Sequence, residues 1–269
     1  MNIKHSLLKI HLLLKEFGID LIKLINSLRA LPIFFFDWFK FRSNYKGLLN
    51  FFPCLNDRYK EGGGDLTKNE YFWQDLLVAR RVRNAAPDKH VDIGSRIDGF
   101  VAHVASFREI EVFDIRPITT AIPGVKFSQI DLMDVNSHNE FLNEEGYCDS
   151  LSSLHAIEHF GLGRYGDPIN PRGHYIGIKN MAKLLRIGGL FYLSTPIGKQ
   201  RVEFNANWVF DPRTIISIAN ENRLELKSLT IFSHIDGVYE LDINENNLSR
   251  LAQQHYSLGM FTFIKLTKN

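Results

Sequence analysis

From residue 68 onward, short apolar runs alternate with stretches whose apolar residues recur at helical spacing. This alternation constrains the fold most, because strands that alternate with helices form a largely parallel sheet covered by helices on both faces. Seven runs are expected to be strands: 90–93, 109–113, 125–130, 150–154, 190–194, 224–232 and 260–266. Helices are expected at 68–84, 99–107, 138–144, 174–186 and 212–221. We therefore expect an α/β fold with a doubly wound, mostly parallel, seven-stranded Rossmann-like sheet.

Two of these helices carry recognisable start signals. Thr67 and Glu70 have the spacing of a capping box, and the helical pattern that follows ends before Pro87. Asp211 and Pro212 suit the N-cap and the first helical position of another helix. These signals predict where the two helices start.

The first 46 residues are both the most basic and the most apolar part of the chain. They hold eight Lys and Arg residues against three acids. We expect helices at 3–16 and 18–30, followed by an aromatic cluster: Phe34, Phe35, Phe36, Trp38, Phe39 and Phe41. The longest apolar run, 31–36, is too short to span a membrane, and charged residues interrupt any signal peptide. Three interpretations stay open: a cap packed on the main domain, a membrane-surface segment or a partner-docking segment.

Three successive glycines at 62–64 predict a domain boundary, which divides the chain into a helical extension (1–60) and a main domain (61–269). A net charge of +2 argues against a dedicated nucleic-acid binder. Cys54 and Cys148 lie far apart and in no metal-ligand spacing, which is typical of reduced thiols in the cytoplasm. The 45% hydrophobic content is enough for a sizeable core.

Acidic residues lie at or just after the ends of three successive expected strands. In a doubly wound sheet the ligand lies outside the carboxyl ends of the strands. Gly94 allows a tight turn directly after Asp92, which lies in the first strand, and a helix follows whose free N–H groups favour an anion. Asp114 ends the second strand, where an acid accepts hydrogen bonds from a ribose, and Asp131 ends the third.

These positions resemble the first three motifs of class I S-adenosylmethionine-dependent methyltransferases. Further matching blocks are a fourth strand that ends in a Glu-His pair (147–159), a Gly-Gly pair before the fifth strand (184–196) and a final strand (259–264). The resemblance covers residues 68–269. The loop 159–168 resembles an uncharacterised methyltransferase-like family that often accompanies bacterial surface-polysaccharide synthesis.

The resemblance implies roles for individual residues. Asp92 and Gly94 would bound the methionine end of S-adenosylmethionine, Asp114 would hold its ribose, and Asp131 would lie near its adenine. Ser95 and Gly99 complete the expected cofactor loop. The chain departs from the family at two positions where glycines are usual, Arg96 and Asp98, and Gly99 comes one place late.

Residues 155–159 allow three interpretations. The spacing His155, Glu158, His159 matches the H-x-x-E-H signature of zinc peptidases, but glycines follow at once and would end a helix there. Alternatively, the histidines bind the backbone only. A third interpretation, which we favour, is a general base, because histidine titrates near neutral pH. We expect His155 to be that base, Glu158 to orient it, and no metal to be bound.

Two segments are candidates for substrate binding. Arg164 and Arg172 suit a carboxylate or phosphate, and Asp167 lies between them. Asn207 and Trp208 suit hydroxyl groups and the face of a sugar. As ordinary alternatives, the Gly-Asp-Pro and Asn-Pro stretches form turns and the Trp is part of the core.

The sequence thus predicts a cytoplasmic methyltransferase that uses S-adenosylmethionine to O-methylate a sugar or sugar-lipid in surface-polysaccharide synthesis, with a contact to the inner membrane surface through residues 1–46. Two alternatives stay open. One is a non-catalytic, methyltransferase-like subunit of a glycan-assembly complex, which the residues Arg96 and Asp98 favour. The other is a nicotinamide-dependent nucleotide-sugar oxidoreductase, although the chain has no complete G-x-G-x-x-G.

Overall fold

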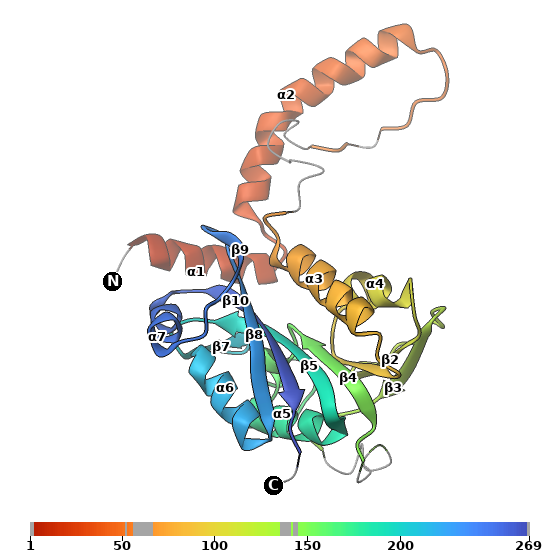
Figure 1. Ribbon diagram of the computed structural model, residues 1–269. Coiled ribbons are helices and arrows are strands. Elements are labelled where there is room, and N and C mark those ends of the chain that lie inside the picture. Colours follow the sequence, from red (N-terminus) through yellow and green to blue (C-terminus); the bar gives the residue numbers. More distant parts are fainter. Residues whose placement is uncertain (1–2, 52, 56–66, 135–140, 142–144, 268–269) are drawn as a thin grey trace. The chain divides into compact units, whose positions relative to one another are not determined.

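The computed structural model describes residues 3–51, 53–55, 67–134, 141 and 145–267. It divides the chain into two compact units, Met1–Leu66 and Thr67–Asn269. Figure 1 shows the elements of both units. The expected boundary at 62–64 and all but one residue of the helix expected at 138–144 lie outside the described residues.

The first unit contains two helices, α1 (Ile3–Glu16) and α2 (Leu21–Asn44). Asp20 caps α2 by accepting a hydrogen bond from the backbone N–H of Lys23 at 2.9 Å. The helix continues through Pro32 to Asn44 and so includes the aromatic cluster, which was expected to lie beyond it. Aromatic packing supports this extension, since the rings of Phe34, Phe35 and Trp38 contact Phe51. Among the described helices, none is long and apolar enough to cross a bilayer.

The second unit is built on an eight-stranded sheet in the order β3-β2-β1-β4-β5-β10-β8-β9. Its strands are β1 (His90–Ile93), β2 (Ile110–Asp114), β3 (Val125–Gln129), β4 (Cys148–Leu154), β5 (Leu185–Ile197), β8 (Leu224–Ser233), β9 (Gly237–Glu240) and β10 (Ser257–Lys265). The first five strands are parallel, and β10, β8 and β9 pair antiparallel. The predicted doubly wound α/β fold is therefore confirmed.

Helices cover both faces of this sheet (Figure 1). On one face, α3 (Glu70–Ala85), the irregular turn η1 (Ile97–Val101) and α4 (Ala102–Ala105) bury Val78, Phe100 and Val104 against β2, β4 and β5. On the other face, α5 (Gly173–Leu184), α6 (Pro212–Glu221) and α7 (Glu245–Gln253) form the larger core. The carboxyl ends of β1 to β4 are left to the loops that carry the candidate site.

Several local features differ from the sequence-based expectation. The sheet has an eighth strand, β9, and a separate hairpin joins β6 (Arg201–Glu203) to β7 (Asn207–Val209). Helix α7 was missed because its sequence is mostly polar and buries only Leu248, Leu251 and Ala252. The N-cap of α3 is Asn69, whose side chain accepts the Tyr71 N–H at 2.9 Å. The capping box expected from Thr67 was therefore wrong.

Candidate active site

The turn after β1 is held by a buried carboxylate. Asp92 accepts hydrogen bonds from the backbone N–H and the hydroxyl of Ser95, at 3.0 and 2.7 Å, and from the Ser152 hydroxyl. Burial raises the pKa of Asp92 to about 7. Asp92 and Ser95 are both buried and do not line the cavity, so their expected contact with a cofactor is indirect. They shape the turn that places Gly94 (φ +73°) at the cavity wall.

The carboxylate of Asp114, at the end of β2, is only 8% exposed and pairs with a neighbouring arginine. Oδ1 accepts hydrogen bonds from the backbone N–H and the Nε of Arg116, and Oδ2 accepts one from Nη2 at 2.6 Å. The Arg116 guanidinium also lies 4.7 Å from the ring centre of Tyr165. A carboxylate has about four acceptor positions, so this pairing leaves about one for another donor.

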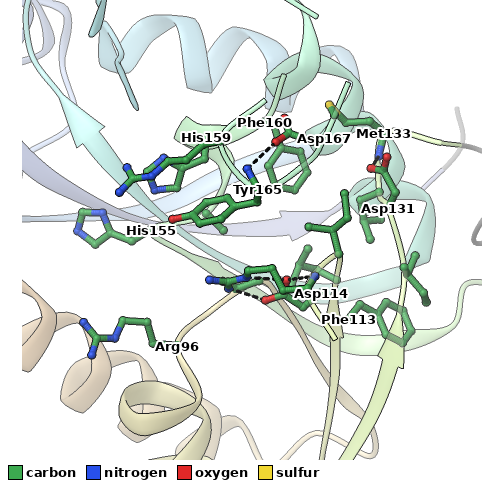
Figure 2. Close-up of a pocket in the computed structure, with 18 of the residues that line it drawn as sticks. Arg96, Phe113, Asp114, Asp131, Met133, His155, His159, Phe160, Tyr165 and Asp167 are labelled. Atoms are coloured by element: carbon green, nitrogen blue, oxygen red, sulfur yellow. Dashed lines mark hydrogen bonds and ion pairs between the residues drawn. The ribbon is translucent and has the colours of Figure 1, made fainter. Parts of the chain in front are cut away.

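Asp114, Asp131 and Gly94 line one cavity of about 360 Å³. Asp131, just past β3, accepts the backbone N–H of Met133 at 2.8 Å. Figure 2 shows Asp114 and Asp131 at the cavity, together with His159 and Tyr165. The volume falls in the range of small-molecule sites. Of the three strand-end acids that the sequence singled out, Asp114 and Asp131 thus line one cavity, and Asp92 is buried behind its wall.

Gly99, expected in the cofactor loop, does not line this cavity. A Cβ at this position would collide with Oδ2 of the buried Asp75 in α3. The glycine therefore allows the turn η1 to pack closely against α3. Arg96 and Asp98, which replace the usual glycines, form an ion pair of 2.6 Å and are both largely exposed. Arg96 also lines the cavity, where its charge is paired with Asp98, whereas Asp98 does not line it.

His155 is held between two carboxylates. It follows β4 with a φ of +50°, and its Nδ1–H donates to Oε1 of Glu158 at 2.7 Å. Its Nε2 lies 3.5 Å from Oε1 of Glu70, which in turn accepts the Tyr256 hydroxyl at 2.8 Å. Burial disfavours the imidazolium, but the carboxylates of Glu158 and Glu70 outweigh it and raise the pKa of His155. A raised pKa makes His155 a less suitable proton acceptor than a neutral imidazole, although the sequence favoured it as the base.

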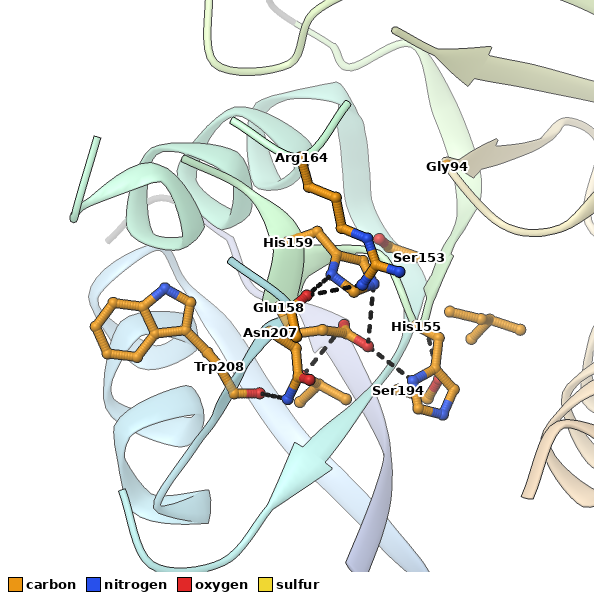
Figure 3. A network of polar contacts seen from close by, with 12 residues as sticks. Gly94, Ser153, His155, Glu158, His159, Arg164, Ser194, Asn207 and Trp208 are labelled. Carbon is orange, nitrogen blue, oxygen red and sulfur yellow. Dashed lines mark hydrogen bonds and ion pairs between the residues drawn. The ribbon is translucent and has the colours of Figure 1, made fainter. Parts of the chain in front are cut away.

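His159 has the environment of a base. It belongs to the short turn η3 (Ile157–His159), and its Nδ1–H donates to the carbonyl of Ala206 at 2.7 Å. This hydrogen bond keeps the proton on Nδ1 and leaves Nε2 as an acceptor, 4.0 Å from Oε1 of Glu158. Burial lowers the pKa of His159, so the ring is neutral at pH 7. Figure 3 shows Glu158 between His155 and His159.

The loop after η3 is shaped by Asp167. Its carboxylate accepts the backbone N–H groups of Gly161, Gly163 and Tyr165, at 2.8, 3.2 and 3.2 Å. The expected substrate contact of Asp167 is thus replaced by a structural role, although the residue lines the cavity. Arg164 also lines it, and its Nη1 donates to the Ala206 carbonyl at 3.0 Å.

The other three expected substrate residues lie outside the cavity lining. Arg172 lies over the ring of Tyr175, with 4.8 Å between guanidinium carbon and ring centre. The ring of Trp208 stacks on Phe210 at 5.8 Å, and in Figure 3 it points away from the polar network. Asn207 donates to the backbone carbonyl of Trp208. Trp208 thus belongs to the core, as the ordinary alternative held.

Several residues of the site were missed in the sequence. Glu70 and Tyr71 come from the first turn of α3, far from the other site residues in the chain. The sequence marked Glu70 only as a capping-box residue, and no local pattern marks either residue as part of the site. The Tyr71 ring lies 4.6 Å from that of His155. The role of Arg116 could have been predicted from the sequence. It lies two residues after the strand-end Asp114, a spacing at which its guanidinium can reach the Asp114 carboxylate.

The zinc-peptidase interpretation does not fit this geometry. A zincin motif needs both histidines on one helical face. Here only three residues form a single turn, and His155 lies outside it in a left-handed conformation. Within the described ranges no cluster of His, Cys, Asp and Glu has the arrangement of a metal site.

Among protein families, one matches part of the chain. The family described as Caenorhabditis protein of unknown function, DUF268, matches residues 117–228. No curated protein matches the chain.

Two of the solved structures with a similar fold are methyltransferases. One is the Burkholderia thailandensis 1,6-didemethyltoxoflavin-N1-methyltransferase with bound S-adenosylhomocysteine: TM-score 0.51, 11% identity, 73% of this chain and 80% of that chain covered. Another is the N-methyltransferase NodS from Bradyrhizobium japonicum WM9. It matches with a TM-score of 0.48 and 14% identity, and the match covers 78% of this chain and 93% of that chain. The first likeness shows that the chain has the fold of class I S-adenosylmethionine-dependent methyltransferases.

Proposed function

We propose that this protein transfers the methyl group of S-adenosylmethionine to a hydroxyl oxygen. One observation carries the proposal: Gly94, Asp114 and Asp131 share a cavity with His159, whose Nε2 is an available acceptor. The first three suit a nucleoside cofactor at the carboxyl ends of the strands, and the histidine suits a base. The methyltransferase fold supports the same activity.

The residues present fit the cofactor. Gly94 brings backbone to the cavity wall without a side chain, and a Cβ there would lie 3.1 Å from that of Ala156. Asp114 retains about one acceptor position for a ribose hydroxyl beside its bonds to Arg116. Asp131 and Met133 suit the adenine end. When bound, S-adenosylmethionine supplies an electrophilic methyl group on a positively charged sulfur.

In this proposal His159 removes a proton. Its Nε2 would take the proton of the acceptor hydroxyl while that oxygen forms its bond to the methyl carbon, and the bond between methyl and sulfur would break with its electron pair left on sulfur. Glu158 stabilises the imidazolium that results, since its Oε1 lies 4.0 Å from Nε2. His155 acts as a positioning residue, because its ion pair fixes the Glu158 carboxylate. The remaining contribution is the alignment of oxygen and methyl group.

For the acceptor we propose a sugar or sugar-lipid of surface-polysaccharide synthesis. The support in the site is Tyr165, a partly exposed aromatic ring at the cavity that suits the apolar face of a sugar. The guanidinium groups of Arg116 and Arg164 lie 4.7 and 5.5 Å from its ring centre and limit its movement.

We further propose that the first unit binds the anionic inner surface of the membrane, which makes the protein cytoplasmic and peripheral. Helices α1 and α2 expose large apolar side chains beside their basic residues. Among them are Leu8, Leu12, Leu13, Phe17, Ile22, Leu28, Phe36 and Phe39. Basic residues beside exposed apolar ones are typical of segments that lie in the membrane interface.

A second candidate is a non-catalytic subunit, and the pairing of Arg116 with Asp114 is the observation that favours it. Calorimetry with S-adenosylhomocysteine and with NAD distinguishes the candidates. Binding of S-adenosylhomocysteine alone is expected. Heat with NAD alone would favour the oxidoreductase, and no heat with either ligand would favour the non-catalytic subunit.

A further inference from the structure

Arg164 is the one arginine of the cavity that has no carboxylate partner among the described residues. Arg96 pairs with Asp98 and Arg116 pairs with Asp114, both at 2.6 Å. The Arg164 guanidinium donates only to the neutral carbonyl of Ala206 and lies over the Tyr165 ring. Because a guanidinium stays charged at any physiological pH, this positive charge at the cavity is not balanced by an ion pair.

The nearby carboxylates are committed elsewhere. Asp167, three residues further along the same loop, binds three backbone N–H groups. Asp114 is held by Arg116 on both of its oxygens. Glu158 is 1% exposed and pairs with His155. The charge of Arg164 therefore remains available for an anion that enters the cavity.

The position of Arg164 relates this anion to the chemistry. Arg164 Nη1 and His159 Nδ1 both donate to the Ala206 carbonyl, at 3.0 and 2.7 Å. Figure 3 shows the guanidinium beside the imidazole ring. A group bound by Arg164 thus lies next to the hydroxyl that His159 would deprotonate.

We propose that the methyl acceptor carries a carboxylate or phosphate group close to the hydroxyl that is methylated, and that Arg164 binds this group. The inference rests on the proposed function, and it narrows the acceptor from sugars in general to acidic ones. Guanidinium and carboxylate or phosphate groups match in bidentate geometry, which would hold the acceptor in one orientation.

The test observes His159 directly by NMR of the full chain with ¹³Cε1-labelled histidine, with and without S-adenosylhomocysteine. His159→Gln assigns the signal. Glucuronate, inorganic phosphate and glucose are the probes, at pH 7.5. We expect glucuronate, phosphate or both to shift the His159 signal saturably, and glucose to leave it in place at equal concentration. Comparing the titrations with glucuronate and with phosphate shows whether the site prefers a carboxylate or a phosphate group.

Arg164→Gln is expected to lower the affinity for the anion at least about tenfold. This is the scale of losing a charge-assisted hydrogen bond. Arg172→Gln, on the same loop but outside the cavity lining, is the matched control and is expected to leave the affinity unchanged. Equal affinity in the wild type and Arg164→Gln, or a His159 signal that no anion moves, overturns the inference. Failure to bind S-adenosylhomocysteine overturns the proposed function instead, since the anion titration without it still reports on Arg164.

Discussion

The imidazole of His155 lies 2.7 Å from the carboxylate of Glu158, and their side chains are only 6% and 1% exposed. Burying an ionised carboxylate is costly unless a partner of opposite charge offsets the lost hydration. His155 meets that need. This relationship leaves His159, whose Nε2 is an acceptor, as the histidine suited to proton removal.

Replacing His159 tests that assignment. With a verified acceptor, His159→Gln is expected to lower kcat by about 10²- to 10⁴-fold, the usual contribution of a general base. The affinity for S-adenosylhomocysteine is expected to stay within about twofold, because the ring faces the acceptor. In the wild type, kcat should rise with pH through a pKa below the ordinary histidine value and be level at pH 7. Unchanged kcat in the variant would rule out the base role.

Removing His155 is expected to destabilise the fold. His155→Ala leaves Glu158 buried without its ion-pair partner, a change that costs about 3–5 kcal/mol. The raised pKa of His155 means that its stabilisation is complete below the unfolded-state pKa and is lost as pH rises through the higher folded-state value. Urea denaturation at several pH values measures both effects. His234→Ala, in a different part of the chain, is the control and should change little.

Asp92 is expected to make the free energy of unfolding decrease as pH rises from acid to neutral. Its pKa rises from 3.8 to about 7 on folding, so the folded state binds more protons between these values. The free energy of unfolding should therefore decrease as pH rises from 4 to 7. Asp92→Asn, which cannot ionise, should show a flatter profile over this range. A wild-type profile that is flat or rises over this range would contradict the assignment.

Asp114 is expected to contribute to cofactor affinity. Asp114→Ala should weaken S-adenosylhomocysteine binding by about 1.5–3 kcal/mol, the scale of hydrogen bonds to a charged group. Asp98→Ala is the matched control, since its carboxylate pairs with Arg96 largely in solvent. Isothermal titration calorimetry measures both. An equal loss in the two variants would point to damage of the loop rather than to a contact with ribose.

Lysines of the first unit are expected to bind anionic vesicles. Co-sedimentation of the full chain with phosphatidylserine-containing vesicles should fall as salt rises, because each basic residue contributes about 1 kcal/mol that ions screen. Lys9→Gln, Lys23→Gln and Lys40→Gln together should weaken binding strongly. The control combines Lys183→Gln, Lys199→Gln and Lys227→Gln in the second unit. Equal sedimentation of both triple variants would exclude the proposed contact.

Much of the fold was predictable because its signals are local. The alternation of strands and helices, and Asp211 as the N-cap of α6, depend on neighbouring residues. Helix α7 and strand β9 were not predictable in this way, since their few buried side chains form no long pattern. Trp208 was ambiguous for a related reason: an aromatic residue gives no local sign of whether it faces a core or a ligand.

By itself the sequence determined the doubly wound sheet and the strand-end positions of Gly94, Asp114 and Asp131. The spacing of apolar residues predicts the strands and helices, and glycine and aspartate mark the turns between them. Because the strands are parallel, the residues at their carboxyl ends meet at one edge of the sheet. The tertiary structure alone decided the protonation of the two histidines. Glu158 and Glu70 together raise the pKa of His155, and the Ala206 carbonyl sets the tautomer of His159. Glu158 is near in sequence, but Glu70 and Ala206 lie far away in the chain, and a histidine's pKa and tautomer depend on the groups that surround it in space.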